Sequence, residues 1–148
     1  MFGNIFHKSA QLIYDDIMSH NNGRIEKASI QKYLNTKGLL ESIVDRAFNE
    51  ELFKVKNSMR SPYYNGLHLI NRKVLIEYLR QLLHSDQRTA PFEMLALEDA
   101  VYTQIAFETE DNNVRKIRIG GIIDRLDRVT DARTGVSTIR VVDYKTGI

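Results

Sequence analysis

The chain has 148 residues, of which 43% are hydrophobic and 27% charged, and its formal net charge is +2. This length and composition predict one ordinary globular domain, without internal repeats or low-complexity tracts. No apolar run approaches the roughly 18 residues that span a bilayer, and the N-terminus lacks the pattern of a secretory signal. The absence of cysteine excludes disulfides and thiolate metal sites. We therefore expect a cytoplasmic protein without membrane contact.

The first half of the sequence predicts four helices. Apolar residues recur at helical spacing over residues 4–20, 25–35, 39–53 and 67–87, with a loop at 57–65. The buried face of the first helix is predicted to hold Phe6, Ala10, Ile13 and Ile17; that of the third, Leu40, Ile43, Val44, Ala47 and Phe48; and that of the fourth, Ile70, Val74, Tyr78 and Leu82.

Basic residues exceed acidic ones in this helical half, with 13 Lys and Arg against 9 Asp and Glu in residues 1–90. Residues 91–148 reverse the balance, with 8 against 10. A basic part beside an acidic part suits a protein that contacts phosphate with one and holds cations with the other.

The candidates for contact with nucleic acid are Lys8, Arg72, Lys73 and Arg80. Ordinary solvated helix faces carry the same residues, so both interpretations stay open.

After Pro91 the pattern changes to strands. Alternating and β-branched residues predict strands over 92–98, 101–108, 114–129 and 138–145, separated by turn-rich segments. Helices followed by an antiparallel meander define an α+β fold, with 1–90 mainly helical and 91–148 forming the sheet. The pair Gly120-Gly121 inside the third strand indicates either a bulge or a close approach of another backbone.

Acidic residues lie inside the last two apolar runs. Residues 130–135 read as a hairpin turn, and a hairpin centred on Arg133 and Thr134 places Asp124 opposite Asp143. Opposed side chains in a sheet lie roughly 5 Å apart. Two carboxylates at that distance repel each other unless a cation lies between them. A hard divalent ion, which prefers oxygen ligands, would suit this place. Lys145 shares a strand face with Asp143. Asp127 is expected to be structural, although another register would bring it to this place instead.

The pattern G-x-x-D-R-x-D over 121–127, followed by D-Y-K-T-G over 143–147, resembles the PD-(D/E)XK nuclease superfamily, and within it the nuclease domains of RecB and AddB helicase–nucleases. Those domains carry G-x-x-x-H on an N-terminal helix, which Gly3 and His7 match. They often have a Glu before the first catalytic strand, where Glu98 stands.

The resemblance implies a restriction-endonuclease-like core and a Mg²⁺-dependent deoxyribonuclease, with Mn²⁺ as a possible substitute. Its metal ligands would be His7, Asp124, Asp143 and the backbone carbonyl of Tyr144. Lys145 would hold or polarise the attacking water and, with Glu98, complete the catalytic set. An exonuclease that works with a helicase portion or subunit in DNA repair and recombination is the expected activity. The iron–sulfur cluster of AddB-type domains is not expected, because it needs four cysteines.

The family continues past D-Y-K-T-G with a further helix, so we expect the 148 residues to be a fragment of a longer protein. Such a fragment would be a poor nuclease and would self-associate through its exposed apolar surface. Two other functions remain open: a non-catalytic nucleic-acid-binding module and a structural domain on the same fold.

Overall fold

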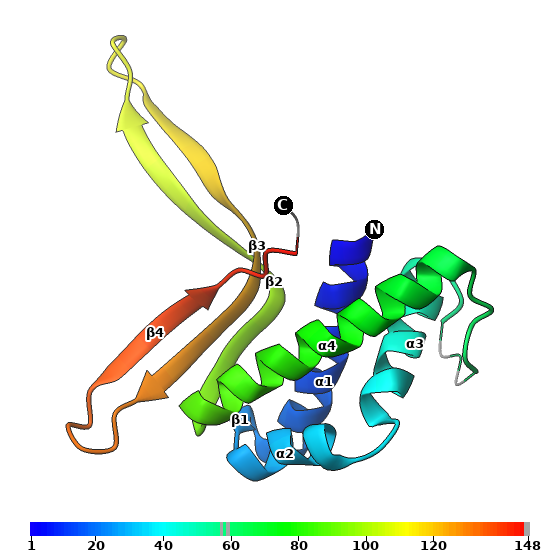
Figure 1. Cartoon of the computed structure of the whole chain (residues 1–148). Helices are drawn as coiled ribbons and strands as arrows, with labels where there is room; N and C mark the ends of the chain where they lie inside the picture. The colour runs from blue at the N-terminus through cyan, green and yellow to red at the C-terminus, as the bar shows by residue number, and fades with distance from the viewer. Residues whose placement is uncertain (57, 59, 147–148) are drawn as a thin grey trace.

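The computed structural model describes residues 1–56, 58 and 60–146. Four helices form one layer and a four-stranded antiparallel sheet forms the other (Figure 1). This α+β arrangement confirms the predicted fold class and is consistent with a restriction-endonuclease-like fold. Gly147, the last residue of the D-Y-K-T-G motif, and Ile148 lie outside the described residues, as do Asn57 and Met59 of the predicted loop. No described helix is both long enough and apolar enough to cross a membrane.

The helical layer is built around α1 (Phe2–Asn21), which packs against α3 (Leu39–Glu51) and α4 (Gly66–Thr89). All four residues predicted for the buried face of α1 are buried. In α3 the predicted face is also confirmed, except that Ile43 is only partly buried. The periodicity of these two helices therefore identified the core.

The predicted face of α4 is wrong except at Leu82, which is partly buried and packs against the core. Ile70, Val74 and Tyr78 are 61%, 36% and 42% exposed, and the helix buries Leu75, Ile76, Leu79, Leu83 and Asp86 instead. Two apolar stripes run along this helix, and periodicity alone cannot tell which of them faces the core. The second predicted helix is also shorter than expected. Arg24–Ile25 forms the short strand β1, and α2 covers Lys27–Asn35.

The sheet has the order β1-β2-β3-β4, with β2 at Phe92–Glu108, β3 at Val114–Thr130 and β4 at Ser137–Val142. The β3–β4 register pairs Leu126 with Val141 and Arg128 with Ile139, which confirms the predicted hairpin centre. β4 ends before Asp143, so Asp143 and Lys145 follow the strand rather than belonging to it.

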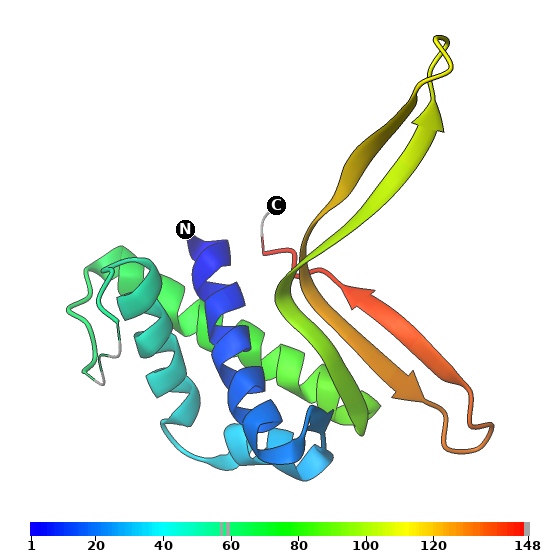
Figure 2. The same ribbon diagram turned by 180° about the vertical axis from the view of Figure 1, so that it is seen from behind.

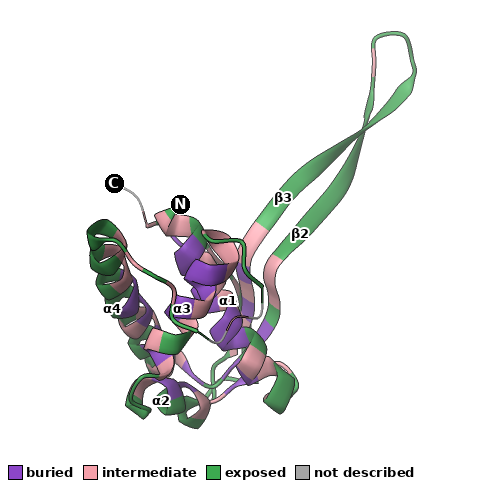
Figure 3. Cartoon of the chain, turned by 90° about the vertical axis from the view of Figure 1, so that its right-hand side faces the viewer, coloured by how far each residue is buried: buried purple, intermediate pink, exposed green. Residues whose placement is uncertain are grey.

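Strands β2 and β3 extend far beyond the helices. Residues 99–123, here called the arm, form a two-stranded hairpin that projects away from the helical layer and is exposed along most of its length (Figures 1, 2 and 3). The arm presents many large apolar side chains to solvent: Val101, Tyr102, Ile105, Phe107, Val114, Ile117, Ile119 and Ile122. Such a surface is suited to the self-association expected from the sequence, which stays a prediction.

Gly120 is where the arm backbone needs a glycine. A Cβ added at Gly120 would lie 2.1 Å from the carbonyl oxygen of Val101 and 2.6 Å from the ring of Tyr102, its cross-strand partner. The close approach anticipated from the sequence is therefore present, but the bulge is elsewhere. The register shifts at Leu95 in β2, between Met94 and Ala96.

The two neighbouring glycines give a matched pair for testing the arm. Gly120→Ala is expected to destabilise the arm by about 1–3 kcal/mol, as overpacking does, because the new Cβ has no space. Gly121→Ala should be neutral or slightly stabilising, since nothing lies within 4 Å of its Cβ position. Amide hydrogen exchange of arm residues measures both effects. Equal protection factors in the two variants would contradict this account of Gly120.

Candidate metal centre

Helix α1 brings His7 to the sheet. Gly3 lies one turn before His7, and a Cβ there would be 3.0 Å from Oγ1 of Thr146. The glycine thus allows the segment after β4 to pass close to α1. The His7 ring packs edge-on against Phe6 and Tyr144, so aromatic contacts on two sides fix its orientation. The close passage of the chain accounts for Gly3 of the G-x-x-x-H pattern, and the fixed ring beside the sheet accounts for His7.

The two strands of the sheet supply one carboxylate each. The β2–β3 register pairs Leu97 with Arg125 and Asp99 with Ile123, which puts Glu98 across from Asp124. Glu98 has a left-handed backbone, with φ of 49°, a conformation that is uncommon for a non-glycine residue and often accompanies functional sites. Together with the bulge at Leu95, it bends β2 where the arm leaves the helical layer.

His7, Glu98 and Asp124 meet as one cluster, and their ligating atoms all lie within 4.8 Å of one another. Nε2 of His7 is 3.2 Å from the carbonyl oxygen of Tyr144. A carbonyl only accepts hydrogen bonds, so Nε2 carries a proton. Nδ1 then faces Glu98 Oε1 at 2.9 Å and Asp124 Oδ1 at 3.5 Å. Two carboxylates around one nitrogen call for a positive charge between them, either a proton or a cation.

Tyr144 supports this cluster through its backbone on both sides. Its amide donates to Asp124 Oδ2 at 2.7 Å and its carbonyl accepts from His7. Its ring is buried and packs edge-on against Phe6 at 5.6 Å, and burial raises the pKa of its hydroxyl to about 12. The carbonyl predicted as a metal ligand thus lies at the cluster, where it bonds His7.

Asp143 and Lys145 lie beside the cluster as an exposed ion pair. Lys145 Nζ is 2.6 Å from Asp143 Oδ2, and the two side chains are 82% and 55% exposed. The hydrogen bond with Lys145 lowers the pKa of Asp143, with a smaller effect from Asp124, and the same bond raises the pKa of Lys145. Lys145 is therefore an ammonium ion at neutral pH, which fits a hydrogen-bond donor better than a base.

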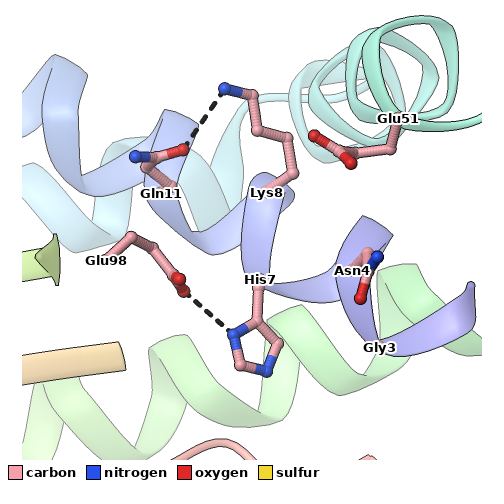
Figure 4. A pocket seen from close by; sticks show the side chains of 7 residues that line it. All are labelled: Gly3, Asn4, His7, Lys8, Gln11, Glu51 and Glu98. Carbon is pink, nitrogen blue, oxygen red and sulfur yellow. Dashed lines mark hydrogen bonds and ion pairs between the residues drawn. The ribbon is translucent and has the colours of Figure 1, made fainter. Parts of the chain in front are cut away.

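A cavity of about 290 Å³ opens beside His7 and Glu98 (Figure 4). Lys8 and Gln11 of α1 line its far side and are bonded to each other at 3.2 Å. Lys8 also pairs with Glu50 at 3.2 Å. A basic and an amide side chain thus stand next to the cluster, on the helix that carries His7.

The other basic residues predicted to contact nucleic acid have different surroundings. Arg72 makes two hydrogen bonds to the buried Asp45, at 2.5 and 3.1 Å, which fits a structural role. Arg80 pairs with Glu77 on the surface of α4, and Lys73 is exposed on the same helix. Among the four candidates, only Lys8 lines the cavity at the cluster.

Sequence reasoning missed a buried charged network directly behind Asp124. Arg125 is 1% exposed and is bound by Asp86 of α4 and by Asp127, which is fully buried. Asp127 is structural, as expected. Asp86 could have been found, because it continues the buried stripe of Leu79 and Leu83, and a carboxylate in an apolar stripe needs a buried partner.

Comparison with curated proteins and with solved structures gave no match. A family model described as the PD-(D/E)XK nuclease superfamily matches residues 1–148, the full length of the chain. The match agrees with a mixed helix–sheet fold that gathers a histidine and two carboxylates beside a lysine. The chain therefore belongs to the PD-(D/E)XK nuclease superfamily.

Proposed function

We propose that the protein is a Mg²⁺-dependent deoxyribonuclease whose centre is the cluster of His7, Glu98 and Asp124. The observation that carries the proposal is the meeting of these three side chains, from α1, β2 and β3, next to the Asp143–Lys145 pair. They come from positions far apart in the chain. Their convergence is thus a property of the fold and not of one local motif.

The donors in this cluster fit a divalent ion. Carboxylate oxygens are the preferred ligands of Mg²⁺ and Mn²⁺, and Mn²⁺ also accepts imidazole. His7 would ligate through Nδ1, because Nε2 is engaged with Tyr144, and the ion would lie between Nδ1 and the carboxylates of Glu98 and Asp124. We propose Asp124 and Asp143 as further ligands, with Glu98 orienting the site. The Tyr144 carbonyl, which the resemblance also implies as a ligand, would join them only after its bond to Nε2 of His7 is broken.

The surrounding residues have distinct roles in this proposal. A bound divalent ion would lower the pKa of a water molecule and offset charge on the phosphate. Lys145 donates hydrogen bonds to the attacking water and to the oxygens that gain negative charge. Asp143 holds the ammonium of Lys145 in place, at 2.6 Å. The Tyr144 amide fixes Asp124, and the Tyr144 carbonyl fixes the His7 ring.

The finer functional assignments also belong to this proposal. We propose DNA as the substrate, exonucleolytic cleavage, and action in repair and recombination together with a helicase portion or subunit, as in the RecB and AddB domains that the motifs resemble. A non-catalytic binding module on the same fold is the alternative. It is less favoured because binding alone does not need a lysine beside clustered carboxylates.

A cleavage assay with end-labelled DNA distinguishes the two functions. The proposal expects shortening of linear DNA that depends on Mg²⁺ or Mn²⁺ and stops on chelation, with closed circular DNA left intact. Isothermal titration on the same preparation measures Mn²⁺ binding whether or not DNA is cleaved. Mn²⁺ binding at His7 and Asp124 without any cleavage, also by a longer form of the protein that extends past residue 148, would favour the binding module. The absence of both would contradict the proposed function.

A further inference from the structure

We propose that Arg125 is a positioning residue for the metal centre. Through the buried network around it, Arg125 holds β3 and α1 at the spacing that keeps Asp124 and His7 within reach of one ion. The inference rests on the proposed function, because it treats the cluster of His7, Glu98 and Asp124 as the site of that ion.

Arg125 fixes the backbone of β3 next to Asp124. Its Nη1 and Nη2 donate to the two oxygens of Asp86 at 2.6 and 3.0 Å, and its Nε donates to Asp127 at 2.7 Å. The guanidinium also lies over the ring of Phe92, at 4.7 Å. A planar fork held on several sides leaves the side chain one orientation. The peptide that links Arg125 to Asp124 is thereby fixed as well.

The same network reaches the helix that carries His7. The Tyr14 hydroxyl donates to Asp86, the partner of Arg125, and the Tyr14 side chain is fully buried. Tyr14 lies seven residues after His7 in α1, which is two turns or roughly 10 Å along the helix. Helix α1 therefore meets β3 at two points, directly through His7 and Asp124 and indirectly through Tyr14, Asp86 and Arg125.

The charges of the network balance. Arg140 of β4 adds two hydrogen bonds to Asp127, at 2.7 and 2.8 Å, so two arginines meet two aspartates. Burial alone would lower the pKa of Arg125, but the hydrogen bonds to Asp86 and the electrostatic effects of Tyr14, Asp86 and Tyr144 together outweigh burial and raise the pKa. Apolar residues of similar volume often stabilise a core as well as a buried ion network or better. Stability alone therefore does not explain the three buried charges of Asp86, Arg125 and Asp127 beside Asp124, whereas orientation does.

Two conservative variants separate positioning from stability. Arg125→Lys keeps the charge but loses the fork that reaches Asp86. Arg140→Lys makes the same change at a residue that hydrogen-bonds Asp127 and lies over the ring of Phe92, without a bond to Asp86. In the folded protein, Arg125→Lys is expected to lower Mn²⁺ affinity about 10- to 100-fold, the range for residues that orient metal ligands. Arg140→Lys should change the Mn²⁺ affinity by no more than about threefold, which is below that range. Isothermal titration measures the affinities, and thermal unfolding reports the stability of each variant.

Crystal structures of the metal-free variants supply a readout that needs no ion. The distance from His7 Nδ1 to Asp124 Oδ1, 3.5 Å here, should lengthen in Arg125→Lys and stay the same in Arg140→Lys. Equal loss of stability in both variants, with this distance and the Mn²⁺ affinity unchanged, would overturn the inference. If the unchanged protein bound no Mn²⁺, the proposed function would fail, whereas the distance would still decide the role of Arg125.

A second matched pair covers the case in which Arg125→Lys does not fold. Tyr14→Phe removes only the hydroxyl that bonds Asp86, and Tyr33→Phe removes one that bonds Asp16 on the opposite side of α1. A loss of Mn²⁺ affinity in Tyr14→Phe but not in Tyr33→Phe would support the inference. Unchanged affinity in both would overturn it.

Discussion

Replacing Asp124 with Asn is expected to lower the affinity for Mn²⁺ by more than about 100-fold and to leave the fold intact. Residues that merely orient a ligand change metal affinity by about 10- to 100-fold, so the loss of a ligand charge should exceed that range. The amide oxygen of Asn can still accept the hydrogen bond from the Tyr144 amide, 2.7 Å long in the present structure, so the local backbone keeps its partner. Isothermal titration with Mn²⁺ measures the loss.

Stability without metal gives an independent check on the Asp124→Asn variant. Removing one of two neighbouring carboxylates relieves repulsion, so the metal-free free energy of unfolding should stay the same or rise. Glu108→Gln, which removes an exposed carboxylate from the arm, is the matched control and should bind Mn²⁺ normally. Asp143→Asn is expected to weaken binding as well, since Asp143 is a proposed ligand. Undiminished binding in both Asp variants would exclude these two residues from the metal site.

The features that follow from local periodicity could be predicted from the sequence. The buried face of α1 and the register of the β3–β4 hairpin are confirmed. In each of these two elements the sequence offers a single apolar pattern. In the hairpin, the turn at 131–135 also determines which residues of β3 and β4 pair. The meeting of His7 with the sheet was inferred only from the family motif, because nothing in the residues themselves shows which helix crosses which strand.

Features that depend on tertiary contacts were not predictable from periodicity. The bulge at Leu95 and the left-handed Glu98 carry no glycine to mark them. The arm could not be foreseen either, because its apolar residues read as ordinary core strands. In α4, Asp86 and the buried leucines form the true interior stripe, and the pattern of Ile70, Val74 and Tyr78 competes with that stripe.

Lys145→Ala is expected to lower the rate of metal-dependent DNA cleavage about 100- to 1,000-fold, the range for losing one donor that stabilises transition-state charge. Metal affinity and folding should change little, because the side chain is 82% exposed and its partner Asp143 is also largely in solvent. Single-turnover cleavage rates, measured at saturating Mn²⁺, test the prediction. Lys37→Ala, at an exposed position between α2 and α3, is the control for loss of a surface charge.

The pH dependence of cleavage distinguishes the two roles that Lys145 can have. Its pKa is raised by the hydrogen bond with Asp143, so the side chain stays charged below that raised value and loses its charge only in more alkaline solution. A donor role therefore predicts cleavage that persists through neutral pH and declines in alkali, whereas a general base would be active only once deprotonated. Lys145→Arg keeps a positive donor at all these pH values and should retain part of the activity without the alkaline decline. If Lys145→Ala cleaves DNA at the unchanged rate, Lys145 is only one half of a surface ion pair and has no part in the chemistry.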